Sequence, residues 1–218
     1  MVGIPPIGTN NDQSIFNLLN QENVKSNDLL KNAAFGQSSI STISELGQTI
    51  NNLYSYAQKT GDENVINGFK SALTSMGSDI TSSRALNFLT YANTLKTNNT
   101  EGFNNLFSTL GKLSNENFGA NTNSVIDTIN NAQGKFGQGG ADKVLEGLNK
   151  ILETGKEENP LGMTDTLNSY LNQINTIFNS GKEQSEIEKA LNDFLTGLGE
   201  QESIASINQY LTNFKPNF

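Results

Sequence analysis

The chain has 218 residues, a net charge of −8 at pH 7, and no Cys, His or Trp. Without thiol or imidazole groups, the common zinc, copper, haem and iron–sulfur sites are excluded, as are Cys and Ser-His-Asp nucleophiles. With 14 basic against 22 acidic residues, no basic face for nucleic acid can be assembled. We therefore expect no cofactor, no metal and no nucleic-acid partner.

The first residues lack the features of a targeting segment. Residues 1–11 contain Pro5 and Pro6, no basic residue and no long apolar run, so a secretory signal is not indicated. No part of the chain approaches the roughly 20 apolar residues of a membrane span. We expect a flexible N-terminal arm over 1–11, a single all-helical domain over 12–214 and a short tail over 215–218.

Large apolar residues recur at helical spacing in four places. In each set they stand at i, i+4 and i+7, which puts three side chains on one helix face. The sets are Phe69/Leu73/Met76, Phe103/Phe107/Leu110, Val144/Leu148/Ile151 and Ile187/Leu191/Phe194. A second apolar series and a turn precede each set. The sequence therefore predicts antiparallel helical hairpins at about 40–77, 82–114, 122–155 and 163–199, followed by a terminal helix over 203–214.

The predicted hairpins recur at similar intervals. Steps of 34, 41 and 43 residues separate Phe69, Phe103, Val144 and Ile187, which is the range of helical-hairpin repeats. The predicted fold class is all-α, with antiparallel hairpins of about 34–43 residues stacked as a repeat-like elongated bundle. An ordinary closed bundle of helices of similar length remains the alternative.

Two local patterns have some features of a binding site. The glycine-rich stretch Gly134–Gly140 precedes a helix, as phosphate cradles do, but it lacks both the preceding strand and the Lys-Ser/Thr pair. We interpret it as a turn. Glu183, Glu186 and Glu188 lie close together, but they do not have the spacing of a calcium loop. We expect them to lie on a solvated helix face, where negative charge favours the helix N-terminus.

Aromatic residues near the first helices of the hairpins are the candidate partner-contact surface. Repeat proteins use concave faces for recognition, and Tyr is favoured there for its amphipathic ring. The candidates are Tyr54, Tyr56, Phe88, Tyr91, Tyr170 and Tyr210. The alternative interpretation is that most of them complete the core and keep a hydroxyl at its edge.

The composition carries the main functional expectation. One Arg, 33 Asn, no Cys and an acidic balance form a profile that resembles bacterial flagellar axial and hook-assembly proteins, which leave the cell by a dedicated route. The resemblance implies a non-enzymatic, exported structural or cell-surface protein of a bacterium. Such a protein would self-assemble or pack into an appendage or extracellular matrix. Its location would be extracellular or at the cell surface by a non-classical route, and homo-oligomers are expected.

Two other classes stay open. The first is an intracellular, cytoplasmic helical-repeat scaffold that binds a protein partner on one face, which the hairpin pattern favours directly. The second is an enzyme that uses carboxylates alone. That class needs two carboxylates in one cleft with unlike environments, and the spacing here predicts no such pair. We expect the chain not to be an enzyme.

Overall fold

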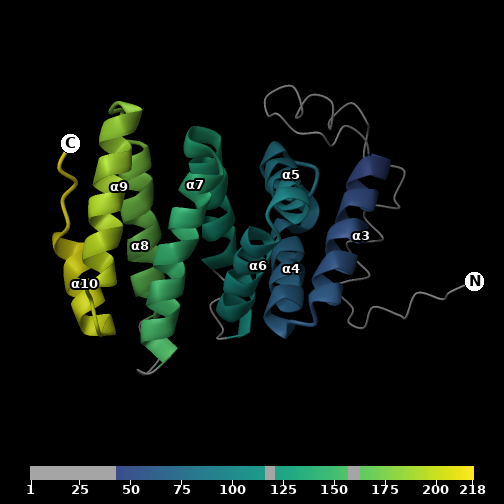
Figure 1. The fold of residues 1–218 in the computed structure, drawn as a ribbon, viewed down its shortest axis with the longest axis horizontal. Coiled ribbons are helices and arrows are strands. Elements are labelled where there is room, and N and C mark those ends of the chain that lie inside the picture. Colours follow the sequence, from purple (N-terminus) through teal and green to yellow (C-terminus); the bar gives the residue numbers. More distant parts are fainter. Residues whose placement is uncertain (1–42, 116–120, 157–162) are drawn as a thin grey trace, which may run out of the picture.

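The computed structural model describes residues 43–115, 121–156 and 163–218, and these ranges contain helices and no strand. The helices stand side by side in one elongated row (Figure 1). They are α3 (Ile43–Thr60), α4 (Glu63–Met76), the short 3-10 helix η1 (Gly77–Asp79), α5 (Ser83–Asn98), α6 (Thr100–Asn115), α7 (Thr122–Lys156), α8 (Met163–Phe178), α9 (Gln184–Gly199) and α10 (Ile204–Asn213). The all-α prediction is confirmed.

The expected arm over 1–11 and the start of the helical domain over 12–42 lie outside the described residues. None of the helices in the described ranges is long and apolar enough to cross a membrane.

Polar side chains fix where the helices begin. Asp62 accepts a hydrogen bond from the Asn64 backbone N–H at 2.8 Å and so caps α4. The Ser203 side chain caps α10 by accepting from the Ser206 backbone N–H at 3.1 Å, and Ser206 bonds back to Ser203. Such caps satisfy N–H groups that the first helical turn leaves unpaired. They explain why short helices rich in Asn hold their boundaries.

The glycine-rich turn is narrower than the sequence predicts. Of residues 134–140, only Gly137 departs from helical geometry, with φ 65° and ψ −157°. Positive φ of this kind is open to glycine and strained for other residues. A single residue therefore folds α7 into a hairpin. We call residues 122–136 the first half of α7 and residues 138–156 its second half.

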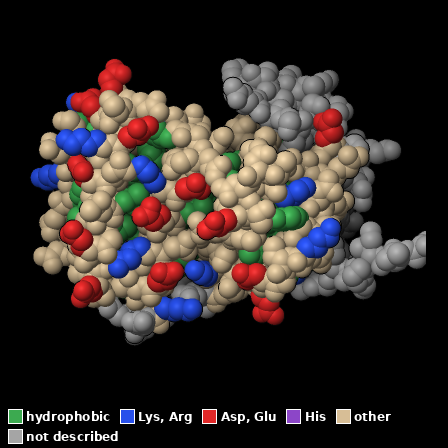
Figure 2. Space-filling model, in the orientation of Figure 1, with side chains coloured by type: hydrophobic (Ala, Val, Ile, Leu, Met, Phe, Trp, Pro, Cys, Tyr) green, Lys and Arg blue, Asp and Glu red, His purple; other side chains and the backbone are tan. Residues whose placement is uncertain are grey.

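The predicted apolar stripes form the core. Val144, Leu148 and Ile151 are fully buried, as are the aromatic rings of Phe69 and Phe103. On the face shown in Figure 2, charged side chains of both signs are scattered among uncharged polar side chains and backbone. Among the described residues, the large hydrophobic side chain that stands exposed is Phe218, at 37%.

Neutral polar contacts join helices of different hairpins. Each buried polar residue of the described ranges bonds to Asn or Ser on a neighbouring helix of the row. The pairs are Thr109–Asn149 (3.1 Å), Asn121–Asn168 (2.7 Å), Thr122–Ser71 (3.3 Å), Thr128–Asn175 (2.9 Å) and Thr166–Asn208 (2.7 Å). We call these five pairs the polar seams. They give the abundant asparagine a structural role, because an amide can donate and accept at once.

The seams also show the direction of the stacking. Asn121, just before α7, bonds to Asn168 on α8, and Thr128 on the first half of α7 bonds to Asn175 further along α8. The two helices therefore run parallel, as stacked repeats require. The pair α4–α6 differs. Asn64 at the start of α4 bonds to Asn115 at the end of α6, at 2.9 Å, so these two helices are antiparallel. Regular stacking therefore extends from α6 to α10.

Candidate functional site

An open groove of about 390 Å³ lies at one end of the α7 and α8–α9 hairpins. Four parts of the chain line it: the end of the first half of α7, the end of α8, the α8–α9 loop and the start of α9. The lining residues are Lys135, Phe136, Phe178, Asn179, Gly181, Lys182, Gln184 and Ile187. The groove forms where two hairpin turns meet, so its residues are far apart in the sequence.

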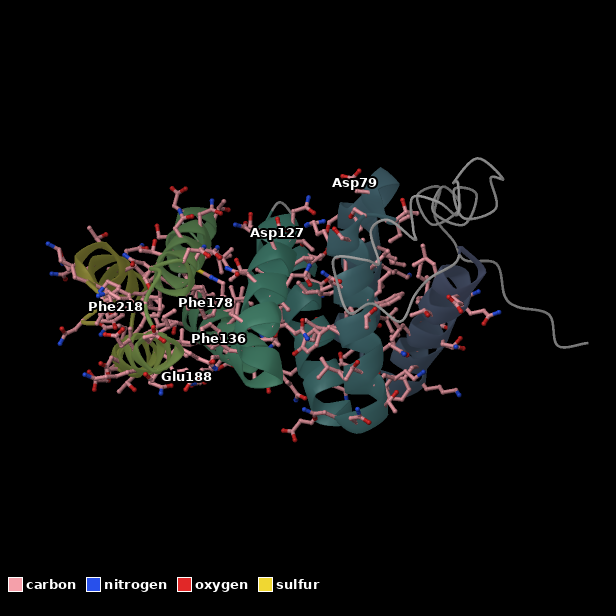
Figure 3. All side chains as sticks on the ribbon, turned by 90° about the horizontal axis from the view of Figure 1, so that it is seen from above. Asp79, Asp127, Phe136, Phe178, Glu188 and Phe218 are labelled. Atoms are coloured by element: carbon pink, nitrogen blue, oxygen red, sulfur yellow. The ribbon has the colours of Figure 1, made fainter. Side chains whose placement is uncertain are left out.

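Two phenylalanines form the apolar floor of the groove. The rings of Phe136 and Phe178 lie 5.2 Å apart between centroids, at an interplanar angle of 30°. In Figure 3 they lie next to each other between α7 and the α8–α9 hairpin. Phe178 is buried, whereas Phe136 is only partly buried against the core. Phe136 directly precedes the helix break at Gly137, and this break brings its ring beside the end of α8.

Two lysines give the groove a positive charge. Lys135 Nζ donates to the Phe178 backbone carbonyl at 2.6 Å and to Asn179 Oδ1 at 3.0 Å, so its ammonium lies at the C-terminus of α8. Cations are favoured at that end of a helix. Lys182 Nζ lies 5.7 Å from the centre of the Phe218 ring. Arg84–Asp127 and Lys112–Glu153 form ion pairs within the described residues, and neither groove lysine takes part in one.

The acidic side chains nearest to the groove bond within the first turns of α9. Glu183 and Glu186 form a capping box, in which the Glu183 side chain accepts from the backbone N–H of Glu186, and Glu186 Oε2 accepts from the backbone N–H of Glu183 at 3.2 Å. Glu188 accepts from Gln184 Nε2 at 3.0 Å. The described ranges contain no group of three or more carboxylates that could hold a metal ion. These glutamates bond at the start of α9, and none of the described residues that line the groove carries a carboxylate.

The structure does not bring the six predicted aromatic residues together into one surface. Phe88 and Tyr170 are fully buried and Tyr91 is 4% exposed, because their rings fill the space between stacked helices. Tyr54 and Tyr56 are half-buried on α3, where Tyr54 stacks on Phe69 and Tyr56 donates to Thr100 Oγ1 at 3.1 Å. Phe88, Tyr91 and Tyr170 therefore belong to the core of the described structure.

Tyr170 on α8 and Tyr210 on the terminal helix α10 make equivalent contacts with the hairpin that precedes each helix. The Tyr170 hydroxyl donates to the Val144 carbonyl at 2.9 Å, and its ring lies against Gly147. The Tyr210 hydroxyl donates to the Phe194 carbonyl at 2.8 Å, and its ring lies against Gly197. Burial raises the pKa of Tyr170 well above its usual value. It also raises the pKa of Tyr210 to about 12, with smaller contributions from Glu200 and Asp193. The Tyr170 ring thus joins α8 to the second half of α7, and the Tyr210 ring joins α10 to α9.

Sequence reasoning did not identify the groove. Lys135 and Phe136 precede one glycine turn, and Phe178 and Lys182 flank another. An aromatic residue at the end of the first helix of two successive hairpins is a usable signal, because parallel stacking places such positions side by side. Applied to the sequence, that signal picks out Phe136 and Phe178.

The chain was also compared with known proteins. No protein-family model, curated protein or solved structure matches it.

Proposed function

We propose that this chain is a non-enzymatic helical-repeat scaffold that binds a segment of a partner protein in the groove of α7, α8 and α9. The observation that carries the proposal is the composition of the groove, which combines an aromatic floor of Phe136 and Phe178 with lysines on two different segments. Aromatic anchors surrounded by polar groups are typical of sites that hold side chains of another protein.

The size and openness of the groove support a protein segment over a small molecule. Its volume of about 390 Å³ accommodates a few side chains, and it stays open along one side. Small-molecule sites enclose most of the ligand surface. A protein segment needs no such enclosure, because it gains further contacts along the outside of the row. The row offers these contacts on flanking helices that are held in place by the core and the polar seams.

Site-specific photo-crosslinking tests this function. A crosslinking amino acid replaces Gln184, an exposed residue that lines the groove, and in a control variant replaces Gln48, an exposed residue of α3. In material from the native source, we expect a defined protein adduct at position 184 that position 48 does not give. Equal adducts at both positions, or none at 184, would count against the groove as a binding site.

A second candidate is an exported structural subunit that self-assembles, at the cell surface or outside the cell. The abundance of asparagine supports this candidate. Exposed asparagines such as Asn51 and Asn52 on α3 can form the same kind of side-chain hydrogen bonds as those that join helices in the polar seams. Copies could pair through such residues as the hairpins pair within one chain. Light scattering after size exclusion over a wide concentration range, with electron microscopy of the same fractions, tests it. Filaments or a concentration-dependent oligomer would favour this candidate, and a monomer throughout would favour the scaffold.

A further inference from the structure

We propose that the groove selects an acidic segment, in which a carboxylate stands next to a large apolar side chain. This inference rests on the proposed scaffold function and specifies the partner chemistry. In a chain of net charge −8, the described residues that line the groove include two lysines and no carboxylate. Opposite charge across an interface guides encounter and discriminates among partners.

Lys135 is held in position to receive a carboxylate. Its ammonium has three N–H donors, and its two hydrogen bonds, to the Phe178 carbonyl and to Asn179 Oδ1, use two of them. Both acceptors are uncharged, so the positive charge is not neutralised. Because these bonds hold the ammonium at the C-terminal end of α8, an incoming carboxylate meets a lysine that has already lost much of its conformational freedom.

Lys182 can change partners at low cost. Its ammonium lies 5.7 Å from the Phe218 ring centre, an exposed cation–π contact worth only about 0.5–1 kcal/mol. The acidic residues that follow it in sequence, Glu183 and Glu186, already bond within the α9 capping box. A carboxylate of a bound segment would therefore face little competition for this lysine from its own chain.

The C-terminal residues indicate how an extended segment can lie here. Phe214 packs on Phe194 of α9 at 4.7 Å between centroids, and the Phe218 ring lies beside Lys182 Nζ. Residues 214–218 have no helical structure, and the contacts of Phe214 with Phe194 and of Phe218 with Lys182 indicate that this stretch runs antiparallel to α9. An extended segment with an aromatic side chain thus already lies along α9 and contacts Lys182, one of the two groove lysines. A bound segment could pack its own apolar side chain on the Phe136–Phe178 floor in a similar way.

Titration with peptides of defined charge tests the inference. The probes are three labelled peptides in which one phenylalanine is flanked by two glutamates, two glutamines or two lysines. Binding is followed by amide chemical shifts of the full chain, which also report the location of the site. We expect the glutamate peptide to bind tightest and to shift residues 178–187, and added salt to reduce its advantage.

Two variants and one matched control isolate the lysines. Lys135→Gln and Lys182→Gln should each weaken binding of the glutamate peptide about two- to fivefold, the range of exposed ion pairs. The same change at Lys59, an exposed residue of α3, should leave binding unchanged. Equal affinity for the glutamate and glutamine peptides would overturn the inference, as would an equal loss with Lys59→Gln. Displacement of the peptide by millimolar inorganic phosphate would also overturn it, because the groove would then be a general anion site.

The outcomes separate this inference from the function on which it rests. A protein adduct at position 184 without preference for the glutamate peptide would leave the scaffold function standing and remove the acidic partner. No adduct at that position and no peptide binding would remove both.

Discussion

Gly68 on α4 and Gly111 on α6 lie where the two helices touch backbone to backbone. A Cβ atom on Gly68 would stand 1.8 Å from the carbonyl oxygen of Phe107, and one on Gly111 would stand 1.9 Å from the carbonyl oxygen of Asn64. No side chain fits into either gap. This contact holds α4 and α6 together. Within the described row, these second helices of the first two hairpins are antiparallel, whereas the stacking from α6 to α10 is regular.

Gly68→Ala and Gly111→Ala should each destabilise the fold. Alanine is normally the better helix former by about 1 kcal/mol, but here its methyl group would force the two backbones apart, at a cost of about 1–3 kcal/mol or more. We therefore expect a lower free energy of unfolding in a denaturant titration. Gly47→Ala is the matched control, because a Cβ there meets no atom within 4 Å, and it should stabilise α3 by about 0.5–1 kcal/mol. A gain of stability at all three positions would contradict the close crossing.

Removal of a tyrosine hydroxyl should have opposite effects at two buried positions. Tyr170→Phe loses the bond to the Val144 carbonyl and should lower the free energy of unfolding by about 1 kcal/mol. The Tyr91 hydroxyl is buried and has no hydrogen-bond partner in the described structure. Tyr91→Phe should therefore be neutral or stabilising, because an unpaired buried polar group is lost. The two variants can be compared by thermal and denaturant unfolding, and a loss at Tyr91 as large as at Tyr170 would show that its hydroxyl has a partner.

Asn149→Ala should weaken the seam between α6 and the second half of α7. Asn149 donates to Asn105 Oδ1 at 2.9 Å and accepts from the buried Thr109 hydroxyl at 3.1 Å. The loss of these two bonds between neighbouring helices should lower the free energy of unfolding by about 1–3 kcal/mol. The control is Asn172→Ala, on an exposed position of α8, which should be neutral or slightly stabilising because alanine is the better helix former.

Asp142 should make stability depend on pH in the acidic range. Burial raises the pKa of its carboxyl group, and a hydrogen bond from Gln138 lowers it by less. A raised pKa means that the fold favours the protonated form, so this contribution is fully present below the ordinary Asp pKa and is lost as pH rises through the raised value. Asp142→Asn should therefore be more stable than the wild type at pH 7, and the difference should shrink towards pH 3. Asp79→Asn, at an exposed site, controls for the change in net charge, and an equal gain there would assign the effect to overall charge.

Leu148→Asp should unfold the chain. Leu148 is fully buried in the stripe of the second half of α7, and an unpaired charge in that place costs several kcal/mol. Leu148→Met keeps the volume and should cost less than about 1.5 kcal/mol. Circular dichroism during heating measures both, and unchanged melting of the aspartate variant would mean that the stripe lies elsewhere.

The helices could be predicted because their signal is local. The stripe of Val144, Leu148 and Ile151 follows the helical period, and each of these side chains is fully buried. The turn at Gly137 was predicted too, although as a longer stretch, because glycines at 134, 139 and 140 remain helical. The spacing of apolar residues and the position of glycines are local signals, so helices and turns can be predicted from them without knowing which helix packs against which.

Two features depend on residues that are distant in the sequence: the groove and the close crossing of α4 and α6. Gly68 and Gly111 lie inside helices, where glycine is unfavourable, and this exception is the sequence signal of a close backbone approach. It does not say which helix approaches. In the same way, Phe136 and Phe178 become a floor only after two hairpins have stacked. The burial of Phe88 and Tyr170 depends on stacking in the same way, since both pack against a neighbouring helix that the sequence does not identify.

The polar seams have a consequence for how such a chain can change in length. An ion pair between repeats needs an acid on one unit and a base on the next, so a duplicated unit must keep both. The Asn175 amide, which bonds to Thr128, offers a donor and an acceptor from one side chain. A hairpin with such residues on both faces can accept its own copy as a neighbour without a complementary charge. Gene duplication could therefore lengthen this row one hairpin at a time, with the new interface already satisfied.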